Sequence, residues 1–307
     1  MTSILYFGTS GASATVLEAL ARTQGFSISG VVTQPDRAVG RGQTVTPSPV
    51  KVAAEKLGLP VLCPENLKDF PLETLPSADI FVVYAYGLII PQVILDCTPH
   101  GALNIHPSLL PKYRGPTPIQ STLMNGETET GTSIMLLDAK MDHGPIFKQM
   151  RLAIDQNDTT ATLTEKLTTL AIPALVQVIS DWTEKKIVPQ AQDDAQATVC
   201  NILTRDDGEI DWEKTNTEIY NLYRGLMPWP GIWTTWNGKR LKLLSITPSP
   251  IRGGMMGGVF TQNNHLYVAT ADASIEITEL QLEGRKPMSA KVFCNGYKKF
   301  SGSVLPS

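Results

Sequence analysis

The stretch DIFVVYAYG, residues 79–87, carries an unbroken run of apolar residues between an aspartate and a glycine. Such a run is typical of a strand that is buried on both faces, because no polar residue alternates with the apolar ones. Helical patterns at 13–23 and 47–59 separate the early strand-like runs. These further runs occupy residues 4–8, 26–34, 60–62, 101–106 and 132–138. Strand–helix–strand repetition predicts a parallel sheet with right-handed crossovers.

The character of the chain changes near residues 200–208. A long helical pattern at 160–186, which we expect Pro173 to interrupt, lies before this point. From about Gly238 onward, short alternating runs are separated by turn residues, a pattern typical of a small antiparallel barrel or sandwich. The sequence therefore predicts an α/β protein with a Rossmann-like parallel-sheet domain over residues 1–204 and a smaller β domain over residues 205–307.

The amino-acid composition indicates which classes of protein this chain can belong to. With 42% hydrophobic and 18% charged residues, the 307-residue chain has the composition of a globular protein. No apolar run approaches the roughly 18 residues that span a bilayer, and the N-terminus lacks a basic segment, so neither a membrane span nor a signal peptide is expected. No C-x-x-C pair occurs, which favours a reducing cytoplasm over a disulfide framework or a zinc site. The cysteines are Cys63, Cys97, Cys200 and Cys294.

Charge is distributed unevenly along the chain. The net charge is −3, but residues 1–204 carry 14 Lys and Arg against 19 Asp and Glu, whereas residues 238–307 carry nine against four. A basic segment beside an acidic body can attract a polyanion. Ordinary scatter of charge over a small domain explains the same counts, and composition alone favours that simpler interpretation.

Asn104 and His106 end the strand-like run at 101–106. Side chains two positions apart on a strand point to the same side, and Pro107, which has no N–H group, ends the strand's hydrogen bonding. In open parallel sheets, ligands bind beyond the carboxyl ends of the strands. This is the edge of the sheet where we expect a functional site.

The sequence gives only weak support for a dinucleotide-binding site or a metal site. FGTSGAS, residues 7–13, resembles a dinucleotide-binding turn with Asp36 as a ribose acceptor, but only Gly8 and Gly11 of the glycine motif are present, so a tight turn explains it as well. No pair of histidines has the spacing of a metal motif, and no metal is expected. The histidines are His100, His106, His143 and His265.

A third arrangement combines Asn104 and His106 with Asp142, which follows the run at 132–138. A carboxylate beside an imidazole suits acid–base chemistry near neutral pH, and an amide N–H beside them can stabilise an oxyanion. No G-x-S-x-G motif is present, which favours direct transfer over a covalent intermediate. A structural alternative stays open on spacing alone: His106 bonds a neighbouring turn and Asp142 caps one.

LNIHPSLLPKYRG (103–115), followed by MDHGPI (141–146), resembles the folate-dependent formyltransferases. Three further segments resemble one branch of that family, the methionyl-tRNA formyltransferases. These segments are VVTQPDRAVGRG (31–42) with PSPVK (47–51), VVYAYGLIIP (82–91) and LQLEGRKPMSAKVFCNG (280–296). The resemblance extends from residue 4 to about residue 300.

The resemblance implies that the first domain binds 10-formyltetrahydrofolate as co-substrate without a metal, and that an OB-like C-terminal barrel binds initiator methionyl-tRNA. It implies that Asn104, His106 and Asp142 are catalytic and that Arg37 and Arg41 contact the tRNA acceptor end. The residues that it implies for folate binding are Ser108, Leu109, Leu110, Pro111, Tyr86, Gly87 and Leu88. A cytoplasmic monomer with no membrane partner is expected.

Other functions remain as alternatives. An amino-sugar (nucleotide-sugar) N-formyltransferase would use the same three residues, but its small acceptor gives no purpose to the basic C-terminal segment or to Arg37 and Arg41. A non-catalytic RNA-binding protein would have no need for the complete Asn–His–Asp set. A nicotinamide-dependent enzyme is the weakest alternative, because the glycine motif is incomplete.

Overall fold

The computed structural model describes residues 1–39 and 44–306. The chain forms two compact units. Unit 1 consists of Met1–Pro118, Glu129–Ala153 and Thr164–Asn201, and unit 2 consists of Ile119–Thr128, Ile154–Leu163 and the chain from Ile202 onward. Two short segments that precede residue 204 therefore pack with unit 2.

Unit 1 contains a seven-stranded sheet in the order β5-β2-β1-β6-β7-β8-β9. Its strands are β1 (Thr2–Gly8), β2 (Phe26–Val32), β5 (Val61–Leu62), β6 (Ile80–Tyr84), β7 (Ala102–His106), β8 (Glu129–Leu136) and β9 (Ile146–Ala153). The first five strands of this order are parallel, as predicted.

The parallel prediction is wrong for residues 132–138, because β8 runs antiparallel to β7 and β9 runs antiparallel to β8. A parallel crossover needs a helix that carries the chain back along the sheet. The helix between β7 and β8, α4 (Pro118–Met124), instead belongs almost entirely to unit 2. The chain therefore re-enters the sheet at the edge it had just left, with Ser133 opposite His106.

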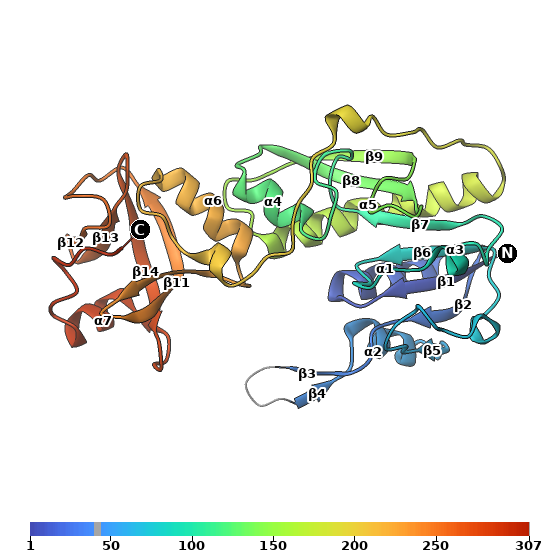
Figure 1. Cartoon of the computed structure of the whole chain (residues 1–307), viewed down its shortest axis with the longest axis horizontal. Helices are drawn as coiled ribbons and strands as arrows, with labels where there is room; N and C mark the ends of the chain where they lie inside the picture. The colour runs from blue at the N-terminus through green and yellow to red at the C-terminus, as the bar shows by residue number, and fades with distance from the viewer. Residues whose placement is uncertain (40–43, 307) are drawn as a thin grey trace. The chain divides into compact units, whose positions relative to one another are not determined.

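Both faces of the sheet are buried, which explains the apolar run that begins at Ile80. Alternate residues of β6 enter different cores: Ile80 and Val82 pack on one face, and Phe81 and Val83 on the other. Helices α1 (Gly11–Arg22), α2 (Pro49–Lys56) and α5 (Thr160–Thr183) contribute to the first core, and α3 (Gln92–Leu95) contributes to the second. Figure 1 shows these helices against the sheet.

Local sequence signals account for the start of α2 but not for the course of α5. Ser48 caps α2, as predicted, by accepting a hydrogen bond from the Lys51 N–H, with Pro49 in the first turn. The expected interruption at Pro173 is wrong, because α5 continues through it. A proline inside a helix costs about 3 kcal/mol. Burial of the flanking residues Ala171, Ala174 and Leu175 in the core offsets that cost.

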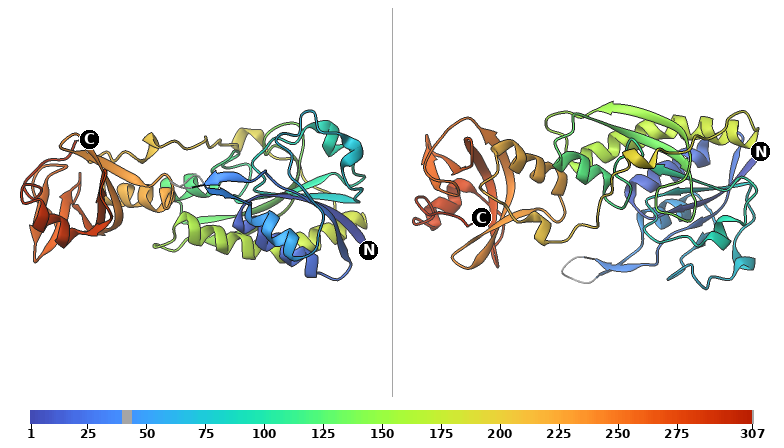
Figure 2. Two further views of the ribbon diagram at one scale, coloured as in Figure 1. Left: turned by 90° about the horizontal axis from the view of Figure 1, so that it is seen from below. Right: turned by 45° about the horizontal axis from the view of Figure 1, so that its top comes forward.

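A small two-stranded ribbon follows β2. It consists of β3 (Arg37–Val39) and β4 (Thr44–Thr46), which pair in antiparallel register. Figures 1 and 2 show this ribbon extending away from the sheet of unit 1. Arg37 lies on β3, whereas Arg41 lies outside the described residues.

Unit 2 is built on an antiparallel sheet in the order β10-β11-β14-β13-β12, with β15 paired to β14, and this confirms the predicted C-terminal β domain. Asn237 and Gly238, both at positive φ, form the tight turn between β10 and β11. Trp212, Phe293 and Phe300 are fully buried in its core. The elements are β10 (Ile232–Trp236), β11 (Lys239–Ser249), β12 (Val259–Gln262), β13 (His265–Ala269), β14 (Ser274–Leu282), β15 (Met288–Ser289), α6 (Asn216–Leu226) and α7 (Ala290–Gly296).

Across residues 1–39 and 44–306, no helix is both long enough and apolar enough to span a membrane.

Candidate active site

The loops that follow the parallel strands of unit 1 are tied together at one edge of the sheet. The hydroxyl of Thr9, after β1, and the amide of Gln34, after β2, both donate to the carbonyl oxygen of Tyr86, after β6, each at 2.8 Å. The adjacent strand β7 ends at His106 on the same edge. The predicted catalytic strand end thus lies beside three loops that these hydrogen bonds tie together.

His106 is buried, with 4% of its surface exposed, and both ring nitrogens face the protein. Its Nε2 lies 2.9 Å from the carbonyl oxygen of Tyr113. A carbonyl can only accept, so Nε2 carries the proton of this bond. Nδ1 lies 3.5 Å from Oδ1 of Asp142. The structure therefore brings together the imidazole and the carboxylate that were predicted to meet.

Asp142 adopts a left-handed backbone conformation, with φ of +49°. Its Oδ2 accepts a hydrogen bond from the Gly115 N–H at 2.8 Å, and 14% of its side chain is exposed. Because Oδ2 is occupied in this way, Oδ1 is the oxygen that faces His106. Unusual backbone conformations in residues other than glycine persist where the surrounding structure fixes them, and they cluster at functional sites.

The segment Tyr113–Gly115 contacts both of these side chains through its backbone. Tyr113 O accepts from His106, and Gly115 N–H donates to Asp142. Gly115 has φ of +121°, and a Cβ there would lie 2.3 Å from the carbonyl oxygen of Cys200, so only glycine fits. This segment belongs to the motif LNIHPSLLPKYRG, but its contacts with the candidate residues could not be predicted from the sequence, because backbone groups leave no residue-type signal.

Asn104 shares its side of β7 with His106 and is half-buried. Within the part of the chain that the structure describes, its amide group has no hydrogen-bond partner. A polar group that is held on a strand and left unpaired is available to a ligand. Asn104, His106 and Asp142 thus supply an amide donor, an imidazole and a carboxylate to one edge of the sheet.

Two family models match nearly the whole chain. Residues 2–179 match the model described as formyl transferase, and residues 202–298 match the formyl transferase C-terminal domain. The chain belongs to the formyl transferase family. This membership agrees with the resemblance found in the sequence.

Individual relatives support the same assignment. The chain is 41% identical over 299 residues to a methionyl-tRNA formyltransferase of Chloroflexus aggregans, a match that covers 95% of this chain and 96% of the relative. It is 38% identical over 307 residues to the methionyl-tRNA formyltransferase of Dehalococcoides mccartyi, with 98% of each covered. Its fold is similar to that of WlaRD, a sugar 3N-formyl transferase whose structure was determined with dTDP and 5-N-formyl-THF. That likeness has a TM-score of 0.67 at 18% identity and covers 93% of this chain and 99% of the other.

In this formyl transferase, Ser133 shapes the predicted folate-contacting segment from Ser108 to Pro111. Its hydroxyl donates to Ser108 O at 2.7 Å and accepts from Leu110 N–H at 3.1 Å. The Ser108 hydroxyl is itself fully buried and donates to Lys112 O at 2.6 Å. Because the Ser108 hydroxyl bonds Lys112 O, we expect Ser108 to contact folate through its backbone, and this contact stays a prediction. Leu109 and Pro111 are partly exposed, whereas Leu110 is buried.

The second predicted folate segment, Tyr86 to Leu88, lies beside the tied loops. Tyr86 is buried edge-on against Phe7, and burial raises the pKa of its hydroxyl to about 12. That hydroxyl has no partner among residues 1–39 and 44–306. Gly87 has φ of +82°, and a Cβ there would lie 2.6 Å from Nε2 of Gln34. Leu88 packs at the border of the second core, and the contacts of all three residues with folate stay predictions.

Arg37 is exposed on the β3–β4 ribbon, 3.9 Å from a carboxylate oxygen of Glu65. The ribbon's base is held by Asp36, whose two oxygens accept from Lys51 Nζ at 2.8 and 2.9 Å. The carboxylate raises the pKa of Lys51 through this hydrogen bond. Asp36 is therefore occupied by Lys51 and not free as a ribose acceptor. Contact of Arg37 with tRNA stays a prediction.

The remaining early candidates have structural explanations. A Cβ at Gly8 would lie 1.8 Å from Oγ of Ser13, so the glycine of the FGTSGAS turn allows β1 to pack closely on α1. His143 Nδ1 lies 2.7 Å from Oδ2 of Asp138. In the described residues, no group of three or more His, Cys, Asp or Glu side chains is arranged to hold a metal ion.

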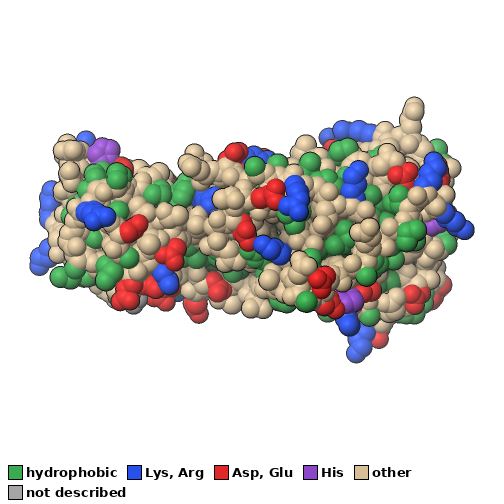
Figure 3. All heavy atoms as spheres, turned by 90° about the horizontal axis from the view of Figure 1, so that it is seen from above, with side chains coloured by type: hydrophobic (Ala, Val, Ile, Leu, Met, Phe, Trp, Pro, Cys, Tyr) green, Lys and Arg blue, Asp and Glu red, His purple; other side chains and the backbone are tan. Residues whose placement is uncertain are grey.

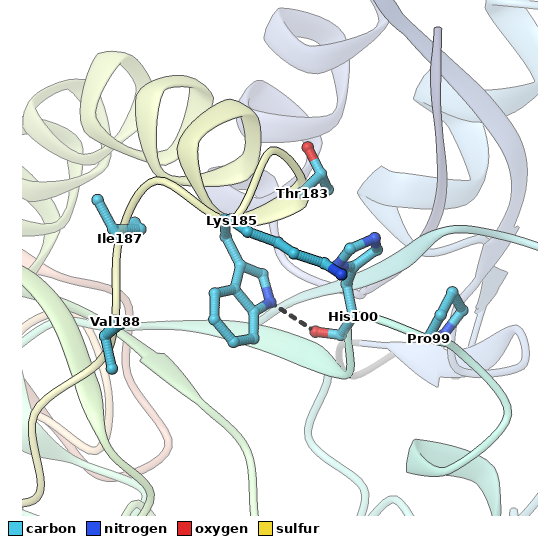
Figure 4. Close-up of a pocket in the computed structure, with 7 residues that line it drawn as sticks. Pro99, His100, Thr183, Lys185, Ile187 and Val188 are labelled. Carbon is cyan, nitrogen blue, oxygen red and sulfur yellow. Dashed lines mark hydrogen bonds between the residues drawn. The ribbon is translucent and has the colours of Figure 1, made fainter.

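A pocket lies at the other edge of the sheet, before β7 begins (Figure 4). It is lined by His100, Trp182, Lys185, Ile187 and Val188, together with Pro99 and Thr183. Trp182 Nε1 donates to the carbonyl oxygen of His100 at 2.8 Å. The pocket contains none of the catalytic candidates.

Proposed function

We propose that this protein is a methionyl-tRNA formyltransferase. It transfers the formyl group of 10-formyltetrahydrofolate to the α-amino group of methionine on initiator methionyl-tRNA, giving the formylmethionyl-tRNA that starts translation. The single observation that carries the proposal is the identity of about 40% along nearly the full length of relatives with that name. The three residues at the end of β7 and in the loop after β8 supply the chemistry that the reaction needs.

The two domains of the chain divide the substrates between them. Residues 1–204 bind folate and catalyse the transfer, and residues 205–307 bind the tRNA. The excess of Lys and Arg over Asp and Glu in residues 238–307 supports this division, because phosphate contacts provide affinity without reading bases. On the face shown in Figure 3, basic and acidic side chains are interspersed. We therefore expect a distributed set of phosphate contacts.

Asn104 and His106 stabilise the negative charge that grows on the formyl oxygen as the amine attacks. The Asn104 amide is half-buried and unpaired among the described residues, so it can donate without first breaking a protein bond. In this mechanism His106 acts with both ring nitrogens protonated, so that Nε2–H is donated to Tyr113 and Nδ1–H is left for the reaction. Its 3.5 Å contact with Asp142 exceeds the usual limit of about 3.2 Å, so the proton is held loosely enough to be shared with the formyl oxygen.

Asp142 accepts the proton that the attacking amine must lose. Its Oδ2 is held by Gly115 N–H, so Oδ1, which faces His106, is the oxygen that receives and passes on the proton. The folate supplies the formyl carbon, and N10 takes up the proton as the leaving group.

The test is a transfer assay with the purified protein, labelled 10-formyltetrahydrofolate and two acceptors. Label should appear in charged initiator methionyl-tRNA and not in an amino-sugar nucleotide. Transfer to the sugar alone would replace the proposal with a sugar N-formyltransferase, and binding of tRNA without transfer to either acceptor would indicate a non-catalytic RNA-binding protein. We also propose that the reaction takes place in the cytoplasm and that the enzyme acts as a monomer. Light scattering of the purified protein measures its oligomeric state.

A further inference from the structure

The side chain of Gln192 lies against the loop that carries Asp142. Its Nε2 donates to the carbonyl oxygens of Asp142 and Gly144, at 2.9 and 2.8 Å. Its Oε1 accepts from Nε and Nη2 of Arg114, at 3.0 and 2.8 Å. A glutamine amide has two N–H groups and two lone pairs on its oxygen, so every position is used and only one orientation satisfies them all.

The Asp142 loop needs such support. A left-handed backbone at a residue other than glycine costs roughly 1–2 kcal/mol, and Asp142 has that conformation. Gly144 passes so close to β8 that a Cβ there would lie 1.8 Å from the carbonyl oxygen of Leu136. Gln192 bonds the carbonyls on either side of His143, so a single side chain fixes the path of the loop at both points.

Arg114, the other partner of Gln192, belongs to the segment that contacts the catalytic pair. Its neighbours Tyr113 and Gly115 bond His106 and Asp142, respectively. The Arg114 side chain is only 12% exposed, and its Nη2 also donates to Asp194 at 2.7 Å. Gly115 N–H thus bonds the Asp142 carboxylate, and Gln192, held by Arg114, bonds the Asp142 carbonyl. Together these contacts close a ring of hydrogen bonds around Asp142.

We propose that Gln192 is a positioning residue for formyl transfer, acting by holding the Asp142 carboxylate toward Nδ1 of His106. This inference rests on the proposed function. Gln192 bonds only protein groups, and its effect passes through Asp142. A catalytic group displaced by about 1 Å can lose a hundredfold in rate. Loss of the Gln192 amide should therefore lower kcat and leave folate binding nearly unchanged.

The experiment compares Gln192→Ala with Gln190→Ala, a matched control two positions away whose side chain is exposed and whose pairing with Ile146 uses only the backbone. We expect kcat with methionyl-tRNA to fall at least about tenfold in Gln192→Ala. The dissociation constant for tetrahydrofolate should change less than twofold, and the control should match the parent.

Gln192→Glu separates positioning from bulk stability. The carboxylate keeps the size of the side chain and its acceptors for Arg114, but it cannot donate to the carbonyls of Asp142 and Gly144. We expect its kcat to fall as far as that of Gln192→Ala. Parental kcat in a folded Gln192→Glu protein would overturn the inference, because the two donated bonds would then have no part in the rate.

Amide hydrogen exchange gives a readout that is independent of turnover. The Gly115 N–H bonds the Asp142 carboxylate, so displacement of that carboxylate should speed its exchange in Gln192→Ala relative to Gln190→Ala. Unchanged exchange at Gly115 would overturn the role of Gln192. Failure of the parent protein to formylate methionyl-tRNA would overturn the proposed function instead, and the exchange result would still decide the positioning.

Discussion

Two histidines, one at the carboxyl end of β7 and one just before its amino end, lie in opposite chemical settings. His106, at the carboxyl end, is buried and lies between a carbonyl and a carboxylate. It shares its side of the strand with Asn104, whose amide has no partner among residues 1–39 and 44–306. His100, just before the amino end, has its carbonyl bonded by Trp182 Nε1 and its ring edge-on to the indole, with 6.4 Å between ring centroids. The same residue type therefore lies beside a carboxylate and an amide at one end and packs against an indole at the other.

Hydrogen bonding separates these ends more clearly than backbone conformation does, because Lys185, beside the pocket at the amino edge, also has a positive φ. Around His106, Tyr113 and Asp142 have positive φ although neither is glycine. At the amino edge of the sheet, polar groups at the starts of strands bond one another. The Asp79 carboxylate, for example, accepts hydrogen bonds from the N–H and the hydroxyl of Ser3. The Asn104 amide has no partner among the described residues, whereas polar groups such as Asp79 and Ser3 at the amino edge are paired, and this difference favours the carboxyl end as the place of a reaction.

Substitutions at the carboxyl end test this contrast with the largest effect. We expect Asn104→Ala and His106→Ala each to slow turnover about a hundredfold or more, because loss of one oxyanion donor costs about 2.7–4 kcal/mol of barrier. Steady-state formylation of methionyl-tRNA measures this. The matched control, His100→Ala, should stay within about twofold of the parent; an equal loss at His100 would remove the distinction between the two ends.

Trp182→Ala tests the structural end. The indole packs against Phe147, with 4.9 Å between centroids, and bonds the His100 carbonyl, so its loss should lower the free energy of unfolding by about 2–3 kcal/mol. Denaturant unfolding measures the change. The kcat of the folded fraction should remain that of the parent, and a large fall in kcat would show that the amino edge also takes part in the reaction.

His100→Ala should have a smaller effect on stability. It removes one edge-on ring contact and keeps the backbone carbonyl that Trp182 bonds, so we expect a loss of about 0.5–1 kcal/mol. A thermal melt compared with that of Trp182→Ala gives the ranking. If His100→Ala were the more destabilising of the two, the imidazole and not the indole would hold this edge together.

Asp79 should add a small stability increment that depends on pH. Hydrogen bonds from the backbone N–H and the hydroxyl of Ser3 lower the pKa of the Asp79 carboxyl. This contribution is present above the unfolded pKa of about 3.9 and is lost as the pH falls through the lower folded value. Because the Asp79 carboxyl is close to solvent, we expect it to contribute less than about 1 kcal/mol to the free energy of unfolding. The difference in Tm between the parent and Asp79→Asn should shrink from pH 6 toward about pH 3; a difference that grows on acidification would contradict the assignment.

Much of the fold could be predicted from the sequence, because the relevant signals are local. The apolar run of β6, the Ser48 cap and the turn-separated strands of unit 2 each depend on near neighbours in the chain. The reversal at β8 could not be predicted, because the direction of a strand depends on where the preceding connection packs. The passage of α5 through Pro173 likewise depends on tertiary burial.

The candidate site, like the fold, has features that could be predicted from the sequence and features that could not. Side chains with distinctive chemistry, Asn104, His106 and Asp142, could be named from the sequence, and the structure brings His106 and Asp142 together. The backbone groups of Tyr113 and Gly115 and the amide of Gln192 could not, because a carbonyl carries no residue-type signal and Gln192 lies in a polar connector. Their hydrogen bonds to His106 and Asp142 can be identified only from the three-dimensional structure.

The central claim is that Asn104, His106 and Asp142 meet at one reacting carbon. The most direct test is a crystal structure of the protein with a stable 10-formyl folate analogue. We expect the formyl oxygen within about 3 Å of Nδ2 of Asn104, with the formyl carbon on the side of Asp142 that faces His106. A folate bound at the amino edge of the sheet, in the pocket beside Trp182, or anywhere that leaves the Asn104 amide without a contact, would contradict the account.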